Sequence, residues 1–282
     1  MFNRSKLRKE TRAALTDQGR LFVKSIAESA PSEIPSNLSE KMNKVLADDL
    51  PLKDAASQLE SLGVLSWAPR SRPNTSVVQE VAALGKLASG GPVVAETEFA
   101  GSARLGRAGE SYREMAEATL PVMNFRKGDI DDGMLDIFNA DRIFPAIASY
   151  VRDVVDATQV DQLVNFVSPV AMRLKNFNIY VNSSVTKTRG WHVDSYGGNQ
   201  LKAFVYLTDV ERMADGPYGY VVGSPSSPGF ESANRFLASA AGANPTDILL
   251  FDSGNVLPFV APAGQVVVSN QSGAHRGFPQ AE

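Results

Sequence analysis

The residues best suited to chemistry in this chain are its two histidines, His192 and His275. His192 lies in the segment Trp191-His192-Val193-Asp194, so a carboxylate follows the imidazole two positions later. Side chains two residues apart in a β-strand point to the same face. His192 and Asp194 could therefore present one imidazole and one carboxylate to the same metal ion.

The second histidine supplies the third ligand of this predicted site. His275 lies 83 residues beyond His192, in the segment Ala274-His275-Arg276-Gly277, and could reach the same ion from another strand. Two imidazoles and one carboxylate leave adjacent coordination positions open, as in non-haem iron(II) oxygenases. A single histidine is more often an ordinary core or surface residue. Here both lie at the ends of predicted strands beside glycine-rich sequence, which favours the metal site.

The strands that would position these residues are expected after Pro169. Short β-rich segments, separated by Gly, Pro, Asn and Ser, are predicted at about 172–182, 201–208, 217–222, 256–260 and 264–269. Crossover helices do not separate most of them, so an antiparallel double sheet or jelly roll fits better than a parallel α/β sheet. Residues 231–241 are predicted to form a short inserted helix.

The first half of the chain is typical of helices. Apolar residues recur at near-helical spacing over 4–29 and over about 133–157, where Pro145 is expected to divide or kink the helix. Capping boxes are predicted at Asn37 with Glu40 and at Ser76 with Gln79, and Gly63 could end a helix. The glycine- and alanine-rich residues 90–110 suggest a loop.

These patterns predict an α+β fold that forms one structural unit. Residues 1–164 would be a mainly helical part, packed on one face of a jelly-roll core over residues 165–282.

Composition limits the function classes. The chain is 43% hydrophobic and 21% charged, with a net charge of −3 and a pI of about 5.6, so no overall basic charge indicates nucleic acid. Cysteine is absent, which excludes disulfides, thiolate metal sites and a cysteine nucleophile. No apolar run approaches the roughly 18 residues that a membrane-spanning helix needs. We expect a cytoplasmic protein with a small-molecule substrate and no nucleic-acid or membrane partner; the sequence does not indicate its oligomeric state.

An ordered series of segments resembles the phytanoyl-CoA dioxygenase family. The segments are Arg189–Asp194, Leu201–Val210, Gly216–Ser224, Gly264–Val268 and His275–Gly277. The resemblance covers about residues 165–282 and implies a double-stranded β-helix, a cupin-like jelly roll, that uses iron(II), 2-oxoglutarate and O₂. It also implies that His192, Asp194 and His275 bind the iron. In halogenating relatives a small residue replaces the carboxylate, so Asp194 favours oxygen insertion into a small metabolite, as hydroxylation or oxidative demethylation, over halogenation. Hydroxylation is the expected reaction.

The residues that would bind 2-oxoglutarate are predicted with alternatives. Asn178-Ile179-Tyr180 resembles an Asn-x-Tyr element with which some branches of the superfamily bind this cosubstrate, and the two polar residues would share one strand face. Relatives usually carry an arginine on a last strand beyond the distal histidine, whereas this chain ends seven residues after His275. Either the sequence is truncated, or Arg276 substitutes, or Lys202 on another strand pairs with the far carboxylate.

Weaker candidates are also apparent. Charged residues that could recognise an anionic substrate are Arg104, Arg107, Arg113, Arg126 and Lys127, and aromatic residues that could line its pocket are Trp191, Tyr196 and Phe204.

Two other functions remain open on the sequence. The first is a cupin-like metalloenzyme that does not use 2-oxoglutarate; such enzymes commonly have three or four histidine ligands, and this chain has two histidines. The second is a non-catalytic binding protein on the same scaffold. A carboxylate buried between two imidazoles has no role in packing, which argues against it.

Overall fold

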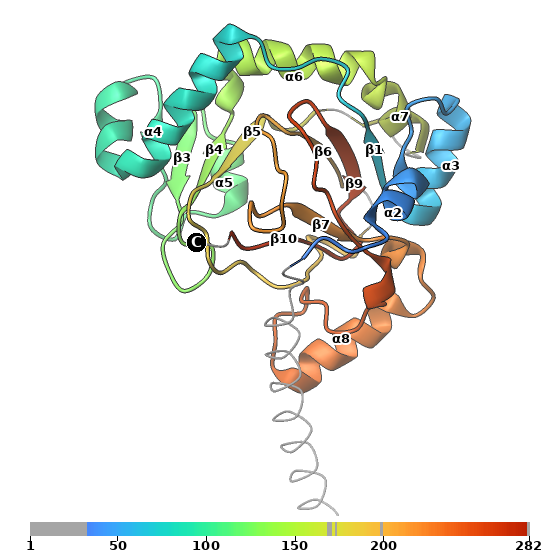
Figure 1. The fold of residues 1–282 in the computed structure, drawn as a ribbon. Helices are drawn as coiled ribbons and strands as arrows, with labels where there is room; N and C mark the ends of the chain where they lie inside the picture. The colour runs from blue at the N-terminus through green and yellow to red at the C-terminus, as the bar shows by residue number, and fades with distance from the viewer. Residues whose placement is uncertain (1–32, 168–170, 173, 198–199, 281–282) are drawn as a thin grey trace, which may run out of the picture.

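A computed structural model describes the chain except for residues 1–32, 168–170, 173, 198–199 and 281–282 (Figure 1). The predicted helix over 4–29 lies outside the described residues. The helices are α2 (Leu38–Val45), α3 (Leu52–Leu62), α4 (Thr75–Glu98), α5 (Tyr112–Ala116), α6 (Pro145–Ala157), α7 (Val160–Val167) and α8 (Phe230–Ala241). The strands are β1 (Val64–Trp67), β2 (Arg104–Leu105), β3 (Val122–Phe125), β4 (Met134–Phe138), β5 (Asn178–Asn182), β6 (Leu201–Val205), β7 (Tyr218–Val221), β8 (Val256–Pro258), β9 (Val266–Asn270) and β10 (His275–Gly277).

The described strands form three sheets. Two are three-stranded, with orders β1-β9-β6 and β10-β7-β8, and all their pairs are antiparallel. The third has the order β2-β3-β4-β5 and is antiparallel except for β2 with β3. The fold is therefore a mixed α and β structure with largely antiparallel sheets, as predicted.

A core between the helices and two of the sheets joins both halves of the chain. Helix residues such as Leu87, Ile147 and Leu163 pack in one cluster with Ile179 of β5 and Val268 of β9. Figure 1 shows α4, α6, α7 and α3 curving around the outer side of the sheets, with α8 set apart below them. Burial of these apolar side chains is the main force that holds the helices to the sheets.

Strands from both sides of residue 165 share sheets. β1 pairs with β9, and β4 pairs with β5. The division into parts at residue 165 stays a prediction, but the first part does contribute β1 to β4. Among the described residues, no helix is both long and apolar enough to cross a membrane.

Several local predictions are confirmed. Gly63 ends α3 with a positive φ of 77°, and its N–H donates to the carbonyl of Leu59, which is the αL cap that favours glycine. The predicted helix at 231–241 is α8, and the predicted β-rich segments overlap β5 to β9.

The helix predicted over 133–157 is wrong in its first part. Residues Met134–Phe138 form β4, because alternate side chains Leu135 and Ile137 enter the core while Asp136 faces the other side. Pro145 does not kink a helix but begins α6, where its missing N–H costs nothing.

Two further local predictions need correction. The region 90–110 is not all loop, because α4 continues to Glu98 after a break at Gly91, whose φ is 65°. The caps also differ: Asn37 precedes α2 without a capping hydrogen bond, and Asn74, rather than Ser76, caps α4 by accepting from Val77 N–H.

Candidate metal centre

Backbone pairing holds the segment Trp191–Val193 on both of its edges. His192 and His275 exchange two backbone hydrogen bonds, with N···O distances of 3.0 and 2.9 Å. On the other edge Val193 N–H donates to the carbonyl of Thr246, and Ile248 N–H donates to that of Trp191. The two histidines are therefore direct partners across neighbouring chain segments, although 83 residues separate them in sequence.

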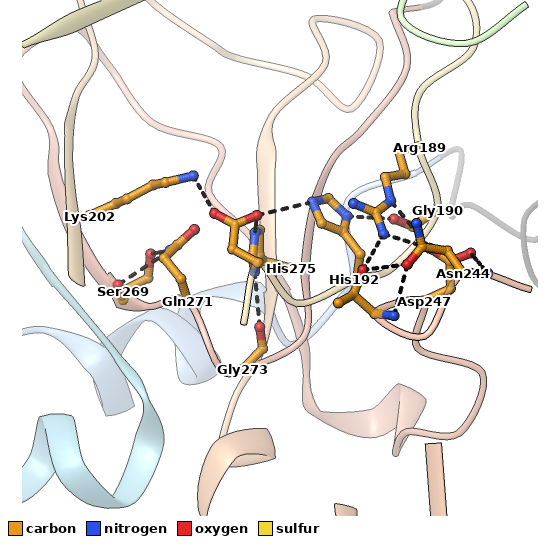
Figure 2. A network of polar contacts seen from close by, with 12 residues as sticks. Arg189, Gly190, His192, Lys202, Asn244, Asp247, Ser269, Gln271, Gly273 and His275 are labelled. Atoms are coloured by element: carbon orange, nitrogen blue, oxygen red, sulfur yellow. Dashed lines mark hydrogen bonds and ion pairs between the residues drawn. The ribbon is translucent and has the colours of Figure 1, made fainter. Parts of the chain in front are cut away.

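This pairing brings the three predicted ligands together. One atom from each of His192, Asp194 and His275 lies within 4.8 Å of the others. Asp194 Oδ1 is 3.9 Å from Nε2 of His192 and 3.6 Å from Nε2 of His275 (Figure 2). Nitrogen and oxygen ligands bind a divalent transition metal at about 2.0–2.2 Å, so ligand atoms at these separations fit around one ion.

Both imidazoles are held in the form that binds a metal. Nδ1 of His192 lies 2.9 Å from the carbonyl of Gly190, and Nδ1 of His275 lies 2.9 Å from the carbonyl of Gly273. A carbonyl only accepts, so each Nδ1 carries a proton, and Nε2 is the nitrogen left to bind a metal. Such a second hydrogen bond is a regular feature of metal-binding histidines.

The charges at the site agree with this assignment. Burial lowers the pKa of His192 to about 3, and the nearby His275 and Arg189 act in the same direction. Burial opposes ionisation of Asp194, but contact with His275 and the positive charge of Lys202 outweigh it, so the pKa of Asp194 lies below its usual value. At neutral pH the site offers a neutral imidazole and a carboxylate, which are the ligand forms that metal binding requires.

Lys202 on β6 is the predicted cosubstrate residue that the structure brings to the triad. Its Nζ lies 2.6 Å from Oδ2 of Asp194, whereas Oδ1 is the oxygen measured to the two histidines. The two side chains are 31% and 26% exposed, so solvent screens this pair only in part. Among the described residues, Lys202 is the one lysine or arginine that forms an ion pair with a triad member.

Arg276 is placed differently. It follows His275 directly on β10, and its guanidinium lies over the rings of Trp191 and Phe278, 6.0 and 5.4 Å from their centroids. Its Nη2 donates to Thr188 Oγ1, whereas its Nη1 is buried with no partner among the described residues. Neighbouring residues of a strand point to opposite faces, so the structure does not bring Arg276 together with the triad.

Asn178 and Tyr180 lie on β5, opposite Phe138 and Asp136 of β4. Within the described part of the chain, neither makes a hydrogen bond or ion pair with a triad residue. The Oδ1 atom of Asn178 is buried and has no hydrogen-bond partner in the part of the chain that the structure describes, while Tyr180 is exposed. Their predicted role in cosubstrate binding stays a prediction.

The other candidate residues are mostly structural. Arg104 and Arg126 form ion pairs with Glu110 and Asp136, and Arg113 forms one with Glu117 on the surface. Trp191 packs in a core cluster, and Phe204 packs against Tyr218.

Sequence reasoning missed the groups on either side of the triad. Arg189 donates to Asp247 Oδ1 and to Thr246 Oγ1 at 2.7 Å each, which ties the segment before His192 to the one it pairs with (Figure 2). On the Lys202 side, the buried Gln271 donates to Ser269 Oγ at 2.8 Å. The sequence places Lys202 and Ser269 on two different predicted strands. It does not show that these two residues lie opposite each other, which is the register found in the structure.

Comparison with known proteins gives structural similarities only. No protein-family model matches the sequence, and no curated protein is significantly similar to it. The resemblance to the phytanoyl-CoA dioxygenase family therefore stays a prediction.

Three of the similar solved structures are described as follows. The non-heme alpha ketoglutarate dependent carbocyclase SnoK from nogalamycin biosynthesis is 20% identical, with a TM-score of 0.49 over 83% of this chain and 79% of that one. The epimerase SnoN in complex with Fe³⁺, alpha ketoglutarate and nogalamycin RO is 13% identical, with a TM-score of 0.49 over 82% and 78%. HygX from Streptomyces hygroscopicus with nickel and 2-oxoglutarate bound is 14% identical, with a TM-score of 0.46 over 83% of each chain. Similarity this distant carries no argument about activity, which has to come from the site itself.

Proposed function

We propose that the protein is an iron(II)- and 2-oxoglutarate-dependent dioxygenase that hydroxylates a small organic molecule. One observation carries this proposal: the Nε2 atoms of two histidines and Oδ1 of Asp194 converge on a common point, with both Nδ1 atoms already hydrogen bonded to carbonyls. Two imidazoles and one carboxylate are the donor set of non-haem iron oxygenases. When bound, the iron with 2-oxoglutarate and O₂ would supply the oxidation, in which 2-oxoglutarate becomes succinate and CO₂ and one oxygen atom enters a substrate C–H bond.

We also infer a double-stranded β-helix core of the phytanoyl-CoA dioxygenase type. The strand order supports it: after β5 the chain passes through β6, then β7 and β8, then β9, then β10, and so alternates between the two three-stranded sheets. Such alternation between two antiparallel sheets is typical of jelly rolls. The bridge between His192 and His275 would add the His192 segment to the sheet of β10, β7 and β8.

Lys202 would act at both the metal ligand and the cosubstrate. By holding Oδ2 of Asp194, it leaves Oδ1 to face the histidines, and so favours binding of the ion through one oxygen. A lysine ammonium has three N–H donors, so two remain for the far carboxylate of 2-oxoglutarate. We propose Lys202, rather than Arg276, as the cation for that carboxylate, with Asn178 and Tyr180 as further candidates.

The proposal is tested by spectroscopy of the full chain. Anaerobic addition of iron(II) and 2-oxoglutarate should produce the metal-to-ligand charge-transfer band, and O₂ should then give succinate. Asp194→Ala should lose the band, whereas Asp129→Ala, a matched change at an exposed carboxylate, should keep it. Iron binding without the band or succinate would favour a cupin-like enzyme that does not use 2-oxoglutarate. Absence of iron binding would favour a non-catalytic binding protein.

The choice of cosubstrate cation has its own test. Lys202→Met should weaken 2-oxoglutarate binding by at least about tenfold, because the proposed charge pair with the far carboxylate of the cosubstrate is lost. Arg276→Met should leave it nearly unchanged, because Arg276 contacts Trp191, Phe278 and Thr188 instead. The two assignments are distinguished by titrating 2-oxoglutarate into the iron(II) form of each variant and recording the metal-to-ligand charge-transfer band. The opposite pattern would assign the role to Arg276.

A further inference from the structure

The segment before His192 is anchored to the loop between β3 and β4. Asp131 lies in this loop, and its N–H donates to the carbonyl of Lys187 at 2.7 Å. Its Oδ1 accepts from the N–H of Arg189 at 3.1 Å. Asp131 therefore holds both ends of a short stretch, residues 187–189, which ends three positions before the first histidine of the triad.

Asp131 is itself held in place by the sheet β2-β3-β4-β5. Its Oδ2 accepts from Nη1 of Arg126 at 2.6 Å, and the two side chains are 16% and 23% exposed. The same guanidinium donates to both oxygens of the fully buried Asp136 on β4. Bonds between a guanidinium and carboxylates are among the stronger hydrogen bonds in proteins. A continuous series of contacts therefore runs from β4 through Arg126 and Asp131 to the backbone of Arg189.

The backbone conformation of Asp131 also indicates a role for its side chain. Its φ is 62°, in the left-handed region that glycine adopts readily and other residues rarely occupy. Gly128 and Gly133 have positive φ in the same loop. A third glycine would have satisfied this conformation, but it could not accept from Arg126 and Arg189.

The carbonyl of Gly190 is the group that this anchoring would position. It accepts from Nδ1 of His192 at 2.9 Å and so leaves Nε2 to bind a metal (Figure 2). Packing does not fix this glycine, because an added Cβ would meet no described atom within 4 Å. The orientation of its carbonyl therefore depends on its neighbours, which are Arg189 and Trp191, the latter paired with Ile248.

Two contacts hold Arg189, and they differ in kind. Its guanidinium binds Asp247 and Thr246, but through a long side chain that is 35% exposed. The hydrogen bond from its N–H to Asp131 acts on the backbone itself. Loss of this second contact would let the carbonyl of Gly190 turn away from the imidazole while the pairing of the following segment stays intact.

We propose that Asp131 is a positioning residue of the metal centre, which holds the backbone before Gly190 so that its carbonyl keeps the proton of His192 on Nδ1. An acceptor oxygen carries this role, rather than the charge, because the donor is the backbone N–H of Arg189. The inference rests on the proposed function for the identity of the metal, but not for the tautomer of the histidine.

The test uses the full chain labelled with ¹⁵N-histidine, which reports only on the two predicted ligands because the chain has no other histidine. NMR of the metal-free protein at about pH 8.5, above the usual pKa of histidine, gives the tautomer of each ring. Titration with Co(II), followed by its visible absorption, gives the metal affinity, and denaturant unfolding gives the stability.

Three variants separate the possible roles of the side chain. Asp131→Gly removes the carboxylate without strain at this φ. Asp131→Asn keeps an acceptor oxygen but removes the charge. Asp132→Ala is the matched control, at an exposed carboxylate of the same loop.

We expect the unsubstituted protein, Asp132→Ala and Asp131→Asn to keep the proton of His192 on Nδ1 and to bind Co(II) with nearly equal affinity. Asp131→Gly should populate the other tautomer of His192, leave His275 unchanged and weaken Co(II) binding by about tenfold, as for other partners of metal ligands. Both changes at Asp131 should lower stability, because both remove the ion pair with Arg126. Metal affinity and stability should therefore separate in Asp131→Asn.

A purely structural role would overturn the proposal, and Asp131→Gly would then lower stability without changing the tautomer of His192 or the Co(II) affinity. An equal change at His275, or failure of Asp131→Asn to keep the tautomer, would overturn it as well. These readouts need neither iron nor turnover. The expected tautomers in a protein that lacks the charge-transfer band would support the positioning role and overturn only the oxygenase assignment.

Discussion

The ion pair between Arg126 and Asp136 offers the sharpest test of what holds the sheet β2-β3-β4-β5 together. Asp136 is fully buried, and Arg126 donates to both of its oxygens, at 2.8 and 3.1 Å. Tyr112 and Asn124 add one hydrogen bond each, both 3.0 Å long. Burial alone would lower the pKa of Arg126, but pairing with Asp136 raises it, so the guanidinium stays charged.

Arg126→Met would remove the only charged partner that the described structure gives this carboxylate, leaving two neutral donors. Removing one partner of a buried pair costs about 3–5 kcal/mol, and the complete burial of Asp136 places this site in that range. We expect Arg126→Met to lower the free energy of unfolding by about that amount. The double change with Asp136→Asn should cost less than the single change, because the fully buried carboxylate no longer carries a charge. Asp131, which Arg126 also contacts at 2.6 Å, loses that partner in both variants, so its loss does not affect the comparison.

The measurement is denaturant unfolding of the single and double variants, with comparison of their m-values. Arg113→Met is the matched control, because the Arg113–Glu117 pair is 80% and 54% exposed and should contribute under about 1 kcal/mol. An Arg126→Met variant as stable as this control would refute the reasoning. So would a double variant whose loss equals the sum of the two single losses.

Two further predictions concern pH and backbone conformation. The hydrogen bond from Arg104 lowers the pKa of Glu110 from 4.5 to about 2, so the pair should contribute stability above pH 4.5 that is lost as pH falls toward 2. Glu110→Gln should therefore flatten the dependence of unfolding free energy on pH over that range, and an unchanged slope would contradict the assignment. Gly264 has a φ of +92°, and an added Cβ would lie 2.4 Å from the carbonyl oxygen of Ser71, so Gly264→Ala should lower the thermal midpoint. Gly85→Ala, in open space on α4, should instead raise stability by about 0.5–1 kcal/mol, and equal effects of the two changes would be evidence against the backbone argument.

The His192–Asp194 pair could be predicted because its information is local. His192 and Asp194 are two residues apart, and the β-rich segments predicted around them are bounded by residues such as glycine and proline. The predicted set His192, Asp194 and His275 is the set that the structure brings together. What the sequence could not provide was the pairing itself, such as the exchange of backbone hydrogen bonds between His192 and His275.

The misassigned elements depend on tertiary contacts. Residues 134–138 have apolar spacing that continues smoothly into α6, and only their place between β3 and β5 makes them a strand. Pairing of β1 with β9 joins Val64 to Ser269, which are distant in sequence, and no local pattern specifies such a pair. The same holds for Lys202, whose contact with Asp194 depends on where β6 lies relative to the end of the His192 segment.

The charge balance of the site links its two proposed ligands. The carboxylate of Asp194 and the ammonium of Lys202 lie 2.6 Å apart, and their opposite charges cancel. A bound divalent ion would add two positive charges. Among the described residues, no further acidic side chain forms an ion pair at the triad that would neutralise them. A dianion such as 2-oxoglutarate would neutralise them, and in a partly buried site this attraction is only weakly screened. Because binding linkage is reciprocal, the ion must strengthen binding of the dianion as much as the dianion strengthens binding of the ion. An acidic residue in place of Lys202 would remove that coupling. In the proposed function, Lys202 would therefore favour a metal with an anionic cosubstrate over a metal alone.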